Sequence, residues 1–127
     1  MIADVSGHGV HAALIASIVK LAAASQRALA DEPSRFLAGM NSALFGNTQN
    51  QFVTAAYVYL DSASRELHYS AAGHPPMLLL RNRRITEGAG NGLILAAFDF
   101  ATYPNATHRL EPGDRILLLY GRHRRSF

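Results

Sequence analysis

The segment Asp4-Val5-Ser6-Gly7-His8-Gly9 is the densest cluster of chemically capable side chains in this 127-residue chain. An acid follows a short apolar run and precedes two glycines, which allow backbone carbonyls to approach a ligand. Hard divalent cations prefer such oxygen donors, so the pattern predicts a metal site at Asp4. Two alternatives remain: Asp4 caps the following helix, or Ser6 is a nucleophile with His8 as base. The second is disfavoured because residues two positions apart on a turn seldom present their side chains to each other.

The segment Gly73-His74-Pro75-Pro76 is the second one with chemical potential. Two prolines stop a preceding strand, so His74 is expected at a rigid bend. We favour a structural role in which His74 hydrogen-bonds a neighbouring loop, with a direct catalytic role as the alternative. The same two hypotheses apply to His8, which we interpret as a turn residue near the site.

Changes in hydrophobic periodicity predict the elements that position these residues. Residues 1–5 are typical of a strand that delivers Asp4 to a loop. The Ala-rich residues 10–30, in which Leu14, Ile18 and Leu21 recur at helical spacing, predict a long helix. A second helix is expected from Pro33, after an acidic cap, to residue 46. Strands are predicted at residues 52–60, 66–72, 77–80, 101–110 and 116–120.

Two helices followed by a meander of strands indicate an α+β fold, in which two antiparallel helices pack on an antiparallel sheet. Residues 52–60 have apolar side chains on both faces, and two helices cover only one face. We therefore expect a second sheet, or a partner, on the other face. Residues 1–121 are predicted to form a single domain, and residues 122–127 a basic, disordered tail.

Composition and charge exclude several classes of protein. Without Cys the chain forms no disulfide scaffold and no thiolate site. Lys20 and Arg27 interrupt the longest apolar run, which stays short of the ~18 to 20 residues of a membrane span, so no membrane partner is expected. No export signal precedes Asp4, so the cytoplasm is the predicted location. Three of the 12 cations lie in the last six residues, and the rest balance nine acids, so no nucleic-acid partner is expected.

Four segments in order resemble the SpoIIE/RsbU-type serine phosphatases of the metal-dependent PPM (protein phosphatase 2C-like) superfamily. They are residues 3–13, with Ala-Asp-Val-Ser-Gly-His-Gly, 54–61, 67–76, with Ala-Ala-Gly-His-Pro-Pro, and 110–120, with Leu-Glu-Pro-Gly-Asp. The resemblance implies a β-sandwich flanked by helices, with two Mn²⁺ or Mg²⁺ ions at one end. It also implies that Asp4 bridges both ions and that the backbone carbonyl of Val5 binds one. Two such ions activate a water for attack on phosphoserine without a protein nucleophile.

The chain also departs from the pattern of these phosphatases. After a strand like 117–120 they continue with Ser or Thr and a metal-binding Asp-Gly, where this chain has Gly-Arg-His-Arg-Arg-Ser-Phe. The segment that precedes Asp4 in the family and its final acidic motif are also missing. Asp114 begins its strand, and at ~3.3 Å per residue it lies roughly 20 Å from the strand's far end. We therefore predict a domain truncated at both ends, with a weak or single metal site and impaired activity.

The resemblance implies a substrate that is a phosphorylated regulatory protein, such as an anti-anti-sigma factor. The alternative function is a non-catalytic protein-interaction module that retains the phosphatase fold. Exposed sheet surface predicts a homodimer as a further option. The cluster of Arg81, Arg83 and Arg84 is interpreted as solvated turn charge, with contact to an acidic protein as the alternative.

Overall fold

The computed structural model describes residues 1–7 and 9–120 of the chain. The predictions for His8 and for residues 122–127 therefore lie outside the described residues. In chain order the elements are β1 (Ile2–Val5), α1 (Val10–Ser25), the short 3₁₀ helix η1 (Arg27–Leu29), α2 (Pro33–Leu44), β2 (Val53–Asp61), β3 (Glu66–Ala72), β4 (Leu78–Arg81), β5 (Arg84–Glu87), β6 (Ala106–Arg109) and β7 (Arg115–Leu117).

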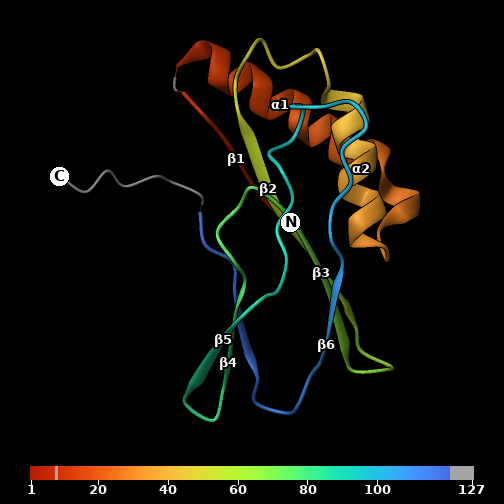
Figure 1. Ribbon diagram of the computed structural model, residues 1–127, viewed down its shortest axis with the longest axis vertical. Coiled ribbons are helices and arrows are strands. Elements are labelled where there is room, and N and C mark those ends of the chain that lie inside the picture. The colour runs from red at the N-terminus through yellow and green to blue at the C-terminus, as the bar shows by residue number, and fades with distance from the viewer. Residues whose placement is uncertain (8, 121–127) are drawn as a thin grey trace, which may run out of the picture.

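The elements form three layers, with the helices on one face of a four-stranded antiparallel sheet and a second sheet on its other face (Figure 1). The first sheet has the strand order β1-β2-β3-β6 and the second has the order β5-β4-β7. The α+β class is confirmed. The prediction of a second layer on the open face is also confirmed, because the chain supplies it with its own second sheet.

Alternation along β1 and β2 assigns each side chain to one of two cores. Val5 and Val53 pack toward the helices, in a core that includes Leu37 and Met40 of α2. Ile2 and Ala56 face the second sheet, in a core with Leu67, Tyr69 and Met77. Since neighbouring residues of a strand point to opposite faces, Asp4 lies on the side of the second sheet.

The two helices differ in how well their sequences predict the buried face. In α2 the predicted stripe of Phe36, Leu37, Met40 and Leu44 is buried, as expected. In α1 the buried residues are Ile15, Val19 and Ala22, whereas Leu14 and Leu21 are exposed. The helix is apolar nearly all round, so periodicity alone could not select which face packs.

The helix boundaries also required correction. The predicted helix over residues 10–30 ends at Ser25, because the chain tightens there: the amide of Gln26 donates to the carbonyl of Ala23 at 3.1 Å, and η1 follows. The second helix begins at Pro33 as predicted, but Glu32 makes no capping hydrogen bond. Its carboxylate pairs with Arg35 at 3.0 Å instead.

A proline shortens the strand that was expected over residues 101–110. The strand expected over residues 101–110 is ordered only at Ala106–Arg109, because Pro104 has no amide hydrogen for a ladder. The carbonyls of Tyr103 and Pro104 accept hydrogen bonds from the hydroxyls of Ser34 and Ser70 instead. The strand β5 was not predicted, since its four residues are all exposed and show no buried alternation.

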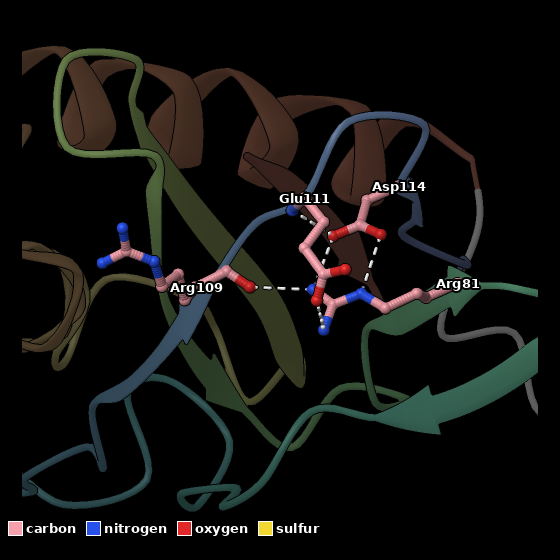
Figure 2. Close-up of polar contacts among 4 residues, drawn as sticks. All are labelled: Arg81, Arg109, Glu111 and Asp114. Atoms are coloured by element: carbon pink, nitrogen blue, oxygen red, sulfur yellow. Dashed lines mark hydrogen bonds and ion pairs between the residues drawn. The ribbon is translucent and has the colours of Figure 1, made fainter.

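Arg81 is not solvated turn charge, and this corrects the interpretation of the arginine cluster. Its guanidinium lies between the carboxylates of Asp114 and Glu111 and also donates to the carbonyl of Arg109 (Figure 2). Arg83 and Arg84 are exposed, as expected. Because β4 belongs to the second sheet and β6 to the first, Arg81 joins the two sheets at this end of the molecule. No helix among the described residues is long and apolar enough to span a membrane.

Candidate functional site

A cleft of about 800 Å³ lies at the C-terminal end of β1. Four segments line it: the end of β1 with its following turn, the start of β2, the bend after β3, and residues of the loop between β5 and β6. The lining residues are Asp4, Val5, Ser6, Gly7, Phe52, Thr54, Gly73, His74, Pro75, Pro76, Asn91 and Ile94. The structure thus brings the two segments that the sequence singled out, around Asp4 and around His74, into one cleft.

Asp4 is half-buried on the wall of this cleft. It lies opposite Thr54 in the antiparallel register of β1 and β2, on the face of the first sheet that is turned toward the second sheet. Among the described residues its carboxylate has no ion-pair partner within 4 Å. The alternative that Asp4 caps the next helix is wrong, because α1 has Gly9 as its N-cap and no side chain caps it.

His74 is almost fully buried, with 1% of its surface exposed, and both ring nitrogens are engaged. Nε2 contacts the carbonyl oxygen of Leu119 and Nδ1 lies 3.1 Å from the hydroxyl of Thr54. A carbonyl only accepts, so Nε2 must hold the proton and Nδ1 accepts from Thr54. Burial lowers the pKa of His74, against the opposite effects of the Leu119 carbonyl and the Asp4 carboxylate. The imidazole is therefore neutral near pH 7.

The contact between His74 and Leu119 has its origin in the register of β4 and β7. Leu78 pairs with Leu117, and continuing that register places Leu119 opposite Pro76. Pro76 has no amide hydrogen to donate, so the ladder cannot extend and the predicted strand over residues 116–120 stops at Leu117. The imidazole of His74 supplies the missing donor and holds the segment after β7 at the cleft.

The hydroxyl of Ser6 accepts one hydrogen bond and donates another. It accepts the amide hydrogen of Phe52 at 2.7 Å and donates to Oε1 of Gln51 at 3.3 Å. The amide of Ser6 also donates to the carbonyl of Phe52 at 2.7 Å, which prolongs the pairing of β1 and β2. Ser6 therefore joins the turn after Asp4 to the loop that precedes β2.

The bend after β3 is held by the glycine-rich loop. Gly73 has a φ of 60° and donates its amide hydrogen to the carbonyl of Gly92 at 2.8 Å. The side chain of Asn91 donates to the carbonyl of His74 at 2.6 Å. Sequence reasoning missed Asn91 and Thr54 as cleft residues. An amide between two glycines and a threonine at the start of a strand were the available signals, but neither indicates a site before the strands are paired.

The donor set for a metal at this cleft is small. No group of three or more His, Cys, Asp or Glu side chains in residues 1–7 and 9–120 lies close enough to hold an ion. Within the described part of the chain, Asp4 is the single carboxylate that lines the cleft. An octahedral Mg²⁺ needs six oxygen ligands, so one carboxylate and one backbone carbonyl leave most positions to water. The described residues alone do not fit a two-metal centre.

Comparison with known proteins decides the family. The family described as Stage II sporulation protein E (SpoIIE) matches residues 1–119. The chain belongs to the SpoIIE family. Within that family it is 31% identical over 120 residues to the protein named Phosphoserine phosphatase RsbU of Bacillus subtilis (strain 168). The alignment covers 92% of this chain and 36% of that protein, so the chain spans about a third of its relative's length.

Solved structures agree with this SpoIIE-family assignment. The crystal structure of the RsbU and RsbW domains of Rv1364c from Mycobacterium tuberculosis matches with a TM-score of 0.72 and 26% identity, over 90% of this chain and 33% of that one. A chain from a structure of the bacterial stressosome matches with a TM-score of 0.67 and 19% identity, over 88% of this chain and 56% of that one, and shows the fold alone. The sequence-based resemblance is confirmed.

Proposed function

We propose that this chain is part of a metal-dependent phosphoserine phosphatase domain that acts on a phosphorylated regulatory protein. Its membership of the SpoIIE family and its similarity to a named phosphoserine phosphatase support the reaction class. The observation that matters most is the position of Asp4, whose half-buried carboxylate lines a cleft large enough for a phosphorylated side chain. In this proposal Asp4 and the backbone carbonyl of Val5 are ligands of Mn²⁺ or Mg²⁺.

The proposal assigns His74 a positioning role rather than a catalytic one. Both of its nitrogens are already bonded, to Thr54 and to Leu119, and its ring is nearly inaccessible. A general base needs a free nitrogen within hydrogen-bond reach of the proton it abstracts. His74 instead holds the segment after β7 next to the cleft through its contact with the Leu119 carbonyl.

The chain by itself is expected to be a poor catalyst. The described residues bring no second carboxylate to Asp4, and a divalent ion held mainly by water is weakly bound. This same observation favours the second candidate, a non-catalytic interaction module with the phosphatase fold. For either candidate we propose an anti-anti-sigma-like protein as partner and the cytoplasm as location. A homodimer through an exposed sheet stays a prediction.

Hydrolysis of a chromogenic phosphate ester with and without Mn²⁺ tests the proposal. We expect slow turnover that requires Mn²⁺ and disappears in the variant Asp4→Asn. The matched control is Asp99→Asn, since Asp99 is exposed and does not line the cleft. Turnover that survives Asp4→Asn would refute the role of Asp4. If the unsubstituted chain shows no turnover at any Mn²⁺ concentration, the interaction module is the better description.

A further inference from the structure

A second hollow, which we call the side groove, adjoins the cleft. It has a volume of about 580 Å³ and lies between the loop from α2 to β2 and residues 94–97. Phe45 and Ala97 contribute exposed apolar surface, and the loop residues 48–51 contribute one hydroxyl and three amide side chains. No charged side chain of the described residues lines it.

The side groove is continuous with the cleft. Phe52 and Ile94 line both hollows, and Phe52 is 60% exposed although it is a large apolar residue. Hydrogen bonds also hold the residues that separate the two hollows. Ser6 bonds the backbone of Phe52 twice and the side chain of Gln51 once, so the groove loop is attached to the strand end that presents Asp4.

We propose that the side groove binds the residues that flank the phosphoserine of a protein substrate. The occupant is an extended, uncharged segment with at least one apolar side chain within a few positions of the phosphoserine. This inference rests on the proposed function, which places the phosphoserine in the Asp4 cleft, and it adds the substrate's sequence preference.

Geometry and chemistry both support this occupant. An extended chain advances about 3.3 Å per residue. Because the side groove shares the lining residues Phe52 and Ile94 with the cleft, the near neighbours of a phosphoserine in the cleft would lie in the groove. Exposed Phe52 and the apolar floor favour burial of an apolar side chain. The amides of Gln49 and Asn50 are suited to the peptide groups of an extended backbone, whereas an acid or a base would lose its hydration there without a partner.

The experiment uses two fluorescent phosphoserine peptides that differ only in the flanking residues, Leu in one and Glu in the other. With Mn²⁺ present, fluorescence anisotropy gives the Kd of each, and phosphate release gives kcat/KM. We expect the Leu peptide to bind about tenfold more tightly, which corresponds to partial burial of one apolar side chain. An equal Kd for the two peptides would overturn the inference.

Two variants and one control locate the effect. Phe45→Ala removes apolar groove surface, and Ala97→Lys places a positive charge there that disfavours Leu and attracts Glu, so each should reduce the preference for the Leu peptide. Phe100→Ala removes an exposed aromatic ring that lines neither hollow, and it should leave the preference and the rate unchanged. If Phe100→Ala has the same effect as Phe45→Ala, the groove is not the binding site.

The outcomes separate this inference from the proposed function. Absence of phosphate release with a retained Leu preference in binding would count against catalysis but support the groove. Phosphate release at equal rates from both peptides would support catalysis and refute the groove. A Leu peptide without phosphate that binds as tightly as its phosphorylated form would also refute the inference, because the groove would then act independently of the phosphoserine.

Discussion

Arg81 and Asp114 form a two-point ion pair, with Nε 2.9 Å from Oδ1 and Nη2 2.6 Å from Oδ2 (Figure 2). Arg81 is the last residue of β4, and Asp114 ends the turn between β6 and β7. Figure 1 shows the turn between β4 and β5 and the turn between β6 and β7 at the end of the molecule away from the helices. The pair therefore holds the sandwich together at the end remote from the cleft.

Replacing Arg81 should lower the stability of the whole sandwich without changing the cleft. Arg81→Ala removes the partner of two carboxylates and a donor to the Arg109 carbonyl, so we expect the melting temperature to fall by several degrees. Arg83→Ala, at an exposed position of the same hairpin, is the control and should change it little. Equal melting temperatures for the two variants would contradict this role of Arg81.

Asp114 should make the free energy of unfolding depend on pH in the acid range. The Arg81 guanidinium, with the amide of Glu111, lowers the pKa of Asp114 from 3.8 to about 2. Because the folded pKa is the lower one, the contribution of Asp114 is complete above pH 4 and is lost as the pH falls toward 2. Urea unfolding between pH 5 and 2 measures this.

Asp114→Asn should be less stable than the unsubstituted chain at pH 5, and the difference should shrink as the pH approaches 2. Asp99→Asn serves as the control, since Asp99 makes no ion pair within the described part of the chain. A difference for Asp114→Asn that stays constant over this range would show that the ion pair does not cause the loss of stability at low pH.

His74 should contribute to stability through its two hydrogen bonds. His74→Phe keeps an aromatic ring but leaves the Thr54 hydroxyl and the Leu119 carbonyl without their partner, at a cost of about 1–3 kcal/mol in the free energy of unfolding. Chemical denaturation measures the loss. His11→Phe, on the exposed side of α1, should cost far less, and a similar loss in both variants would argue against the hydrogen bonds as the cause.

Gly73 should tolerate no side chain. At its φ of 60° an added Cβ is strained by roughly 1–2 kcal/mol, and it would also lie 2.6 Å from Cγ2 of Ile94. Gly113→Ala is a matched control, since Gly113 has a φ of 90° and open space around the added Cβ. Gly73→Ala should therefore destabilise more than Gly113→Ala in a thermal melt, and the reverse order would show that Ile94 moves aside freely.

Local signals in the sequence were sufficient to predict the class of fold and to single out Asp4 as a candidate site residue. Proline and acid positions predicted the start of α2, and strong alternation predicted β3 at its observed bounds. Asp4 could be singled out because a carboxylate before a glycine turn is an uncommon local pattern with a chemical explanation. The β5 strand and the shortened β6 differ from the prediction, because an exposed strand has no buried face to show alternation, and because Pro104 cannot donate to a ladder that exists only once the strands are paired.

Amino-acid sequence by itself determined the α+β class, the family resemblance and the choice of Asp4, since each depends on residues close together in the chain. Only the tertiary structure decided that His74 bonds Leu119, that Thr54 and Asn91 share the cleft with Asp4, and that Arg81 is paired. The hydrogen bonds that fix these positions join residues 17 to 45 positions apart in the sequence. Register follows from which ladder hydrogen bonds a proline permits and which faces are buried, and those are properties of the packed sheets.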